Sequence, residues 1–164
     1  MNKIVIAAIT AFFVATGCSG GEKKSENKQT TEQKAEDSDG LTDFQMKNGI
    51  GPVIEPVSIG EIDEELAEQG EQIFQTKCSA CHKLAERYVG PPLGDVLNMR
   101  TPAYVMNMTL NPDQMLKEHP EAKKLLAEYM TPMPNQNITR EEARAIVEYL
   151  TSASQEAGSG ETGN

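Results

Sequence analysis

The sequence has few of the residues that build large cores and membrane spans. Aromatic residues make up 5% of the 164 positions, Trp is absent, and only three Cys are present. An odd number of Cys does not close a disulfide framework, and no apolar run reaches the 18 or more residues that a spanning helix needs. The formal net charge of -10, without any cluster of Lys and Arg, argues against nucleic-acid binding. We therefore expect one lean domain with unstructured appendages.

The first 17 residues have the pattern of an export signal. Lys3 supplies a positive charge, and residues 4–15 form an almost continuous apolar run of the length found in cleaved signals. The run ends at Ala15-Thr16-Gly17-Cys18, which resembles a bacterial lipobox, although Ala15 stands where Leu is usual. We expect Cys18 to carry lipid and to anchor an exported protein to a membrane of the cell envelope, facing the periplasm. The alternative is an ordinary cleaved signal in which Cys18 has no role.

A linker is expected over residues 18–57, starting at the lipidated Cys. Residues 19–40 are rich in Glu, Lys, Ser, Gln and Thr, a composition that cannot form a core. Residues 41–57 differ, because apolar side chains are scattered through them around a Gly-Pro pair. The sequence leaves open whether residues 41–57 pack as a strap against the domain or continue the linker.

The rest of the chain predicts an all-α domain. Apolar spacing fits a helix over residues 62–77. Thr-Pro, Asn-Pro and His-Pro junctions predict three further helices, because Pro is favoured in the first turn. These helices are expected over 102–110, 112–118 and 120–130. A capping box at Thr139 predicts the start of the last helix, and residues 154–164 are expected to form a disordered tail.

The chemistry is concentrated in Cys78-Ser79-Ala80-Cys81-His82. Cys-x-x-Cys-His is the attachment signature of c-type haem: two thiols one helical turn apart reach both vinyl groups of a porphyrin, and the next imidazole is aimed at the iron. A zinc site is the first alternative, but no second thiol pair follows and only His119, expected to be a solvated capping residue, remains. A thioredoxin-type pair is the second alternative, but it needs an α/β pattern that is missing.

Around this motif, residues 59–152 resemble the small monohaem cytochromes c of class I. Gly70, Phe74 and Cys78 match the family's Gly-x-x-x-aromatic-x-x-x-Cys run, and Tyr149 and Leu150 stand where the crossing helix is expected. The resemblance implies an all-α fold of about four to five helices around one covalently bound haem c, with the N- and C-terminal helices crossed. It places the cytochrome c domain at residues 58–153, with Cys78 and Cys81 as the thioether residues.

The resemblance also implies the axial ligands of the haem iron. His82 is the expected proximal ligand, and the carbonyl of Pro91 would accept the proton on its Nδ1. The sixth ligand in this family is usually a Met on a loop before the last helix. Met133 fits, because prolines on both sides keep it out of a helix and restrict its loop. Met130, one turn earlier, is the alternative. Most of the remaining candidates are expected in the core: Met99, Met106, Met108 and Met115.

These features predict a one-electron carrier rather than an enzyme. With both axial positions filled, no site for substrate remains. The expected partners are membrane or periplasmic redox enzymes, and the carrier is expected to be monomeric.

Residues 58–153 carry 15 acidic and 9 basic residues, and six of the acids lie between Glu61 and Glu71. They form either a solvated helix face or a docking surface for a basic patch. Two alternative functions are a haem-based sensor with a displaceable Met and a subunit of a larger oxidoreductase.

Overall fold

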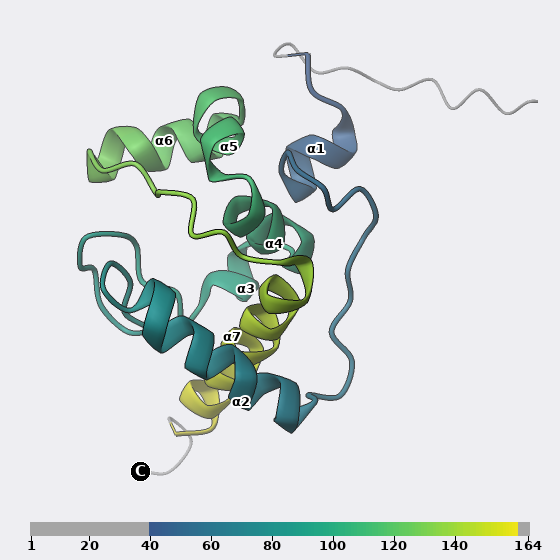
Figure 1. Cartoon of the computed structure of the whole chain (residues 1–164), viewed down its shortest axis with the longest axis vertical. Coiled ribbons are helices and arrows are strands. Elements are labelled where there is room, and N and C mark those ends of the chain that lie inside the picture. Colours follow the sequence, from purple (N-terminus) through teal and green to yellow (C-terminus); the bar gives the residue numbers. More distant parts are fainter. Residues whose placement is uncertain (1–39, 161–164) are drawn as a thin grey trace, which may run out of the picture. The chain divides into compact units, whose positions relative to one another are not determined.

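The computed structural model describes residues 40–160, with side chains described through residue 155. Residues 1–39 lie outside the described residues, and so does the predicted lipidation site Cys18. Within residues 40–160 the chain forms seven α-helices and one π-helical turn (Figure 1). They are α1 (Asp43–Asn48), α2 (Glu64–Ile73), the π-helical turn η1 (Phe74–Cys78), α3 (Val96–Met99), α4 (Pro102–Leu110), α5 (Pro112–Glu118), α6 (Pro120–Tyr129) and α7 (Arg140–Gly160). None of the described helices has the length and apolar character required to cross a membrane.

Helices α4, α5, α6 and α7 begin at the Pro junctions and the capping box that the sequence predicts. The Thr101 hydroxyl accepts a hydrogen bond from the Tyr104 backbone N–H at 3.1 Å, at the start of α4. At the start of α7, the Thr139 hydroxyl accepts from the Glu142 N–H at 3.2 Å, and the Glu142 carboxylate accepts from the Thr139 N–H at 2.8 Å. This is the predicted capping box. The last helix is longer than expected, since it runs to Gly160, and α1 and α3 were not predicted.

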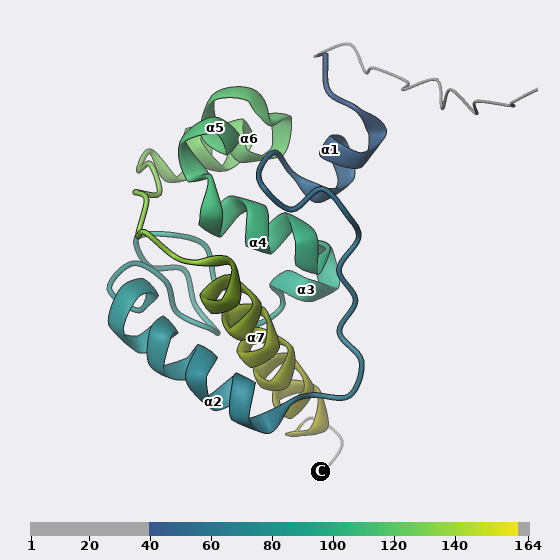
Figure 2. The same cartoon turned by 45° about the vertical axis from the view of Figure 1, so that its right-hand side comes forward.

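Helices α2 and α7 cross in close contact, as both views show (Figures 1 and 2). At the crossing, a Cβ on Gly70 would overlap the carbonyl group of Ala145. One turn further along, the ring centroids of Phe74 and Tyr149 lie 5.4 Å apart, and Leu150 is buried in the same core cluster. The predicted crossing of the first and last helices of an all-α domain is confirmed.

Residues 41–57 pack as a strap against the helices. Leu41, Ile50 and Val53 are buried, and the strap is held by the fully buried side chain of Asn107 in α4. The amide oxygen of Asn107 accepts from the Val53 N–H at 2.9 Å, and its amide nitrogen donates to the carbonyls of Asn48 and Val53, each at 2.9 Å. Buried backbone groups need hydrogen-bond partners. The Asn107 side chain supplies them here, because the irregular strap does not form those bonds within itself.

His119 is the one capping residue whose surroundings were predicted wrongly. It does accept a hydrogen bond from the Glu121 N–H at 3.3 Å and so caps α6, but its side chain is fully buried. The strap is the reason: Nε2 of His119 lies 3.2 Å from the carbonyls of both Gln45 and Met46 in α1. Burial lowers the pKa of His119. The neutral Nε2–H tautomer satisfies both neighbours, since Nε2 donates to α1 while Nδ1 accepts from α6.

Replacing Gly70 by Ala tests the helix crossing. The added methyl group has no room beside Ala145, so we expect the substitution to lower the free energy of unfolding of the holoprotein by about 3 kcal/mol, even though Ala favours helix over Gly by about 1 kcal/mol. Denaturant unfolding measures the difference. Gly60→Ala is the matched control, because a Cβ at Gly60 meets no atom within 4 Å. Equal stabilities of the two variants would contradict the packing described above.

Candidate functional site

The two cysteines are placed by the widened turn that ends the first long helix. Because η1 is π-helical, the Ser79 N–H donates to the Phe74 carbonyl, five residues back, at 2.9 Å. The chain then closes a tight turn in which the N–H groups of Cys81 and His82 both donate to the Cys78 carbonyl, at 3.0 and 2.9 Å. Short π-helical segments of this kind often mark functional sites. The turn brings Cys78, Cys81 and His82 to one cavity wall, and no disulfide joins the two cysteines.

The imidazole of His82 is held by the loop that follows it. Nδ1 of His82 lies 2.9 Å from the carbonyl oxygen of Pro91, and the Gly90 N–H donates to the Cys81 carbonyl at 2.8 Å. A Cβ on Gly90 would overlap the His82 ring, so the glycine lets the loop approach the imidazole closely. Nδ1–H donates to Pro91 in this arrangement, which leaves Nε2 as the nitrogen with a free lone pair.

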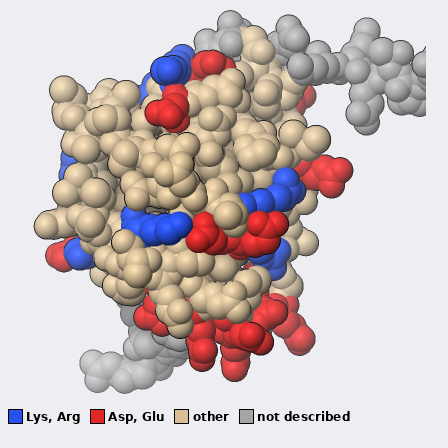
Figure 3. Space-filling view, in the orientation of Figure 1, with Lys and Arg blue, Asp and Glu red and all other residues tan. Residues whose placement is uncertain are grey.

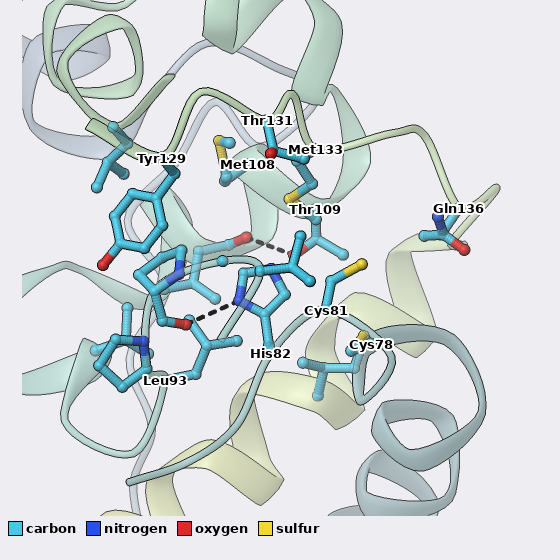
Figure 4. A pocket seen from close by; sticks show the side chains of 18 of the residues that line it. Cys78, Cys81, His82, Leu93, Met108, Thr109, Tyr129, Thr131, Met133 and Gln136 are labelled. Carbon is cyan, nitrogen blue, oxygen red and sulfur yellow. Dashed lines mark hydrogen bonds between the residues drawn. The ribbon is translucent and has the colours of Figure 1, made fainter. Parts of the chain in front are cut away.

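These groups line a cavity of about 280 Å³ between η1, α4, α6, α7 and the segment before α7. Its lining is mainly apolar and includes Phe74, Val89, Leu93, Val96, Val105, Leu116, Leu125, Leu126, Ile146 and Leu150. Figure 4 shows Cys78 and Cys81 at one side of the His82 ring, with Met133, Met108 and Thr131 beyond it. Two thiols, an imidazole and a thioether sulfur therefore share one apolar cavity.

The structure separates the two candidates for the sixth ligand. Met133 is half-buried and lines the cavity, on a segment that is not helical. Met130 ends α6 in the left-handed conformation, with φ of 55°, and its side chain is 81% exposed. Met106 and Met115 are buried in the two hydrophobic clusters, as expected of core residues. Met108 lines the cavity instead, and so does Met99, whose expected burial is wrong because its side chain is 68% exposed. Of the two candidates, only Met133 is within the cavity wall.

The charged groups around the cavity are mostly neutralised in pairs. Lys77 pairs with Glu142 at 3.1 Å, Arg87 with Glu128 at 2.8 Å, and Arg100 with Glu121 at 2.8 Å. Burial raises the pKa of the Cys78 thiol, a change that the neighbouring Lys77 partly offsets. An uncharged thiol is the form that fits an apolar wall.

Several lining residues were not anticipated from the sequence. Arg100, Tyr104 and Tyr129 contribute to the cavity wall, and the Arg87 guanidinium stacks on the Tyr129 ring with its central carbon 3.9 Å from the ring centroid. They come from separate segments and carry no local motif.

A zinc site is disfavoured, because His119 lies against α1 with both ring nitrogens engaged and does not line the cavity.

Comparison with known proteins agrees with this arrangement. The sequence pattern of the family "Cytochrome c" matches residues 67–154. A solved cytochrome c from Rhodothermus marinus is 48% identical, with a TM-score of 0.65 over 69% of this chain and 97% of its own. An engineered form of that cytochrome gives 48% identity and a TM-score of 0.64, over 68% and 97% of the two chains. The cytochrome c domain of the pp3183 protein from Pseudomonas putida is 33% identical, with a TM-score of 0.52 over 57% and 94%. No curated protein matches the sequence.

The fold and the site define a monohaem electron-transfer domain of the c type. The chain belongs to the cytochrome c family. The cofactor of this family is one covalent haem c, and the chain is an electron-transfer protein. The axial and thioether roles of the residues named above stay predictions.

Substitution of the two methionines separately tests the sixth ligand. Met130→Ala should leave the thioether–iron absorption band and the reduction potential of the holoprotein unchanged, because the side chain is exposed. Met133→Ala should lower the potential by on the order of 0.1 V or more, because loss of the axial sulfur removes a ligand that favours ferrous iron. Optical redox titration of both variants measures this. A large shift in Met130→Ala with none in Met133→Ala would reverse the assignment.

Proposed function

We propose that this protein is a membrane-tethered monohaem cytochrome c that carries single electrons between membrane or periplasmic redox enzymes. The observation that carries the proposal is the cavity wall that holds Cys78, Cys81, His82 and Met133 together. Domain interiors are normally close-packed, so an apolar cavity lined by two thiols, an imidazole and a thioether favours a bound cofactor. The donor set fits haem c: two thiols for the vinyl groups and two soft or borderline ligands for iron.

When bound, haem supplies an iron that cycles between the ferric and ferrous states. In this proposal Cys78 and Cys81 fix the porphyrin edge by thioether bonds. His82 coordinates through Nε2, and the Pro91 carbonyl, by accepting the Nδ1 proton, orients the ring and strengthens it as a ligand. Met133 would supply the thioether sulfur as the second iron ligand, and the apolar lining would keep water away from the iron. Filled axial positions favour electron transfer over binding of gases or peroxide.

The acidic cluster is better explained as a solvated helix face than as the docking surface. Its six acids, between Glu61 and Glu71, are all exposed, and Figure 3 shows acidic side chains gathered at the end of the molecule where α2 begins. Helical rise places the acids of α2 about 10 to 20 Å from Cys78 along the helix, which exceeds the Debye length of about 8 Å at physiological ionic strength. A partner that docks at the cavity mouth would be only weakly guided by these charges.

Replacing Cys78 and Cys81 together by Ala tests the cofactor assignment. Without the thiols no thioether bond forms, so denaturing gels stained for haem should lose the band entirely, while the wild type retains it. Met130→Ala serves as the matched control, because its side chain is exposed and lies outside the cavity. A haem-stained band in the double variant would refute the proposed attachment.

The membrane tether has its own test at Cys18. If Cys18 is the lipidated first residue of the mature chain, intact-mass measurement should show a chain that begins there and carries the mass of two or three acyl chains, because dual acylation is what gives stable anchoring. Cys18→Ala should lack that added mass, and Ser19→Ala should keep it. A mature wild-type chain with a free Cys18 thiol, or one that begins elsewhere, would contradict the tether.

A further inference from the structure

The segment that carries Met133 has few contacts that would hold it in place. Residues 131–136 form no helix, and no hydrogen bond connects them with another segment of the described chain. The position of Met133 therefore depends on the two helices that flank its segment. Helix α7 is fixed in the core by its crossing with α2, so the other support must come from the end of α6.

Arg87 is the residue that ties the end of α6 to the rest of the domain. Its guanidinium donates to the Glu128 carboxylate at 2.8 Å and to the Glu128 backbone carbonyl at 3.1 Å. The central carbon of the same guanidinium lies 3.9 Å from the centroid of the Tyr129 ring. Within the described chain, no other hydrogen bond or ion pair joins residues 126–129 to another element. We call Arg87, Glu128 and Tyr129 the Arg87 clasp.

The chemistry of the clasp suits the end of a helix. The Glu128 carbonyl is one of the last four of α6, which have no partner within the helix. The last turn of α6 contains no basic residue of its own, so Arg87 supplies the positive charge that the carboxyl end of a helix favours. Arg87 and Glu128 are each about half exposed, and their ion pair alone would contribute little. The backbone hydrogen bond and the ring contact add to it, because a guanidinium can donate in its plane while its face stacks.

Arg87 projects from a loop that is itself well held. The Leu93 N–H donates to the Lys83 carbonyl at 2.9 Å and closes the base of this loop. The same loop holds His82, because the Pro91 carbonyl lies 2.9 Å from Nδ1 of the imidazole. The clasp therefore connects the end of α6 to the segment that orients the proximal ligand.

We propose that Arg87 is a positioning residue for the sixth iron ligand, which holds the Met133 segment at the cavity by clasping the end of α6. Tyr129 lies four residues before Met133, and Figure 4 shows both side chains at the cavity that His82 lines. The clasp thus links the two segments that carry the predicted axial ligands, and without it local opening that takes the sulfur off the iron becomes more frequent. The proposal rests on the proposed function, since it needs Met133 on haem iron.

Binding of imidazole to the ferric holoprotein tests the proposal. Imidazole is mostly uncharged at about pH 8, and it reaches the iron only when Met133 has left, so its apparent affinity follows the population of the open state. Arg87→Gln should raise that affinity about tenfold, which corresponds to about 1.4 kcal/mol, and should keep the thioether–iron band when imidazole is absent. Arg87→Lys should give a smaller rise, because it retains the charge without the planar fork.

Two further variants show whether the effect runs through the clasp. Glu128→Gln removes the ion pair but keeps the backbone carbonyl, so it should raise the imidazole affinity less than Arg87→Gln does. The double variant should match Arg87→Gln, because both substitutions act on one set of contacts. Lys124→Gln is the matched control: it also removes a positive charge at α6, but Lys124 is 74% exposed and pairs with Glu121 of the same helix. Its imidazole affinity should equal that of the wild type.

The outcomes separate positioning from a merely structural role. If Arg87→Gln and Glu128→Gln lower the free energy of unfolding but keep the wild-type imidazole affinity, the proposal is refuted. An equal rise in Lys124→Gln would also refute it, because the effect would then belong to charge in general. Should Arg87→Gln yield no holoprotein, Arg87→Lys and Glu128→Gln decide the question by the same measurement. A wild type without a thioether–iron band would instead refute the proposed ligation by Met133.

Discussion

The crossing of α2 and α7 at Gly70 is the contact on which the rest of the molecule depends. Because Gly70 lies directly on the Ala145 carbonyl, the two helices approach closely enough for Phe74 to pack on Tyr149. That contact fixes η1 and, through it, the turn that carries Cys78, Cys81 and His82. The apolar face of α7 then supplies Ile146 and Leu150 to the cavity. A backbone contact about two helical turns before Cys78 thus sets the position of the chemistry.

Local signals predicted most of the fold. The Pro junctions and the capping box at Thr139 gave correct helix starts because capping depends on residues within one turn. The short helix α1 has such a signal too: Thr42 and Gln45 form a capping box, with the Gln45 N–H donating to the Thr42 hydroxyl at 3.2 Å. The sequence analysis did not recognise α1 as a helix, because its residues show little apolar periodicity. Helix α3, with four residues, has too little periodicity to be recognised.

Features that depend on distant segments were not predictable. His119 was expected in solvent because nothing in its neighbourhood shows that the strap, more than 70 positions earlier, covers it. The same holds for Asn107, whose three strong hydrogen bonds all go to residues 48–53. At the site, the Cys-x-x-Cys-His motif is local and was visible, whereas Arg100 and Tyr104 join the cavity only through tertiary packing. The local motif therefore identifies the residues that bind the cofactor, whereas tertiary packing determines which other side chains surround them.

The central claim is that one haem, ligated by His82 and Met133, exchanges single electrons in this cavity. Potentiometric titration of the holoprotein with full optical spectra tests it most directly. The account predicts one covalent haem, low-spin in both oxidation states, with a thioether–iron band in the ferric form and a single one-electron Nernst transition. High-spin iron, or rapid binding of carbon monoxide by the reduced form, would show an open coordination position and contradict the account.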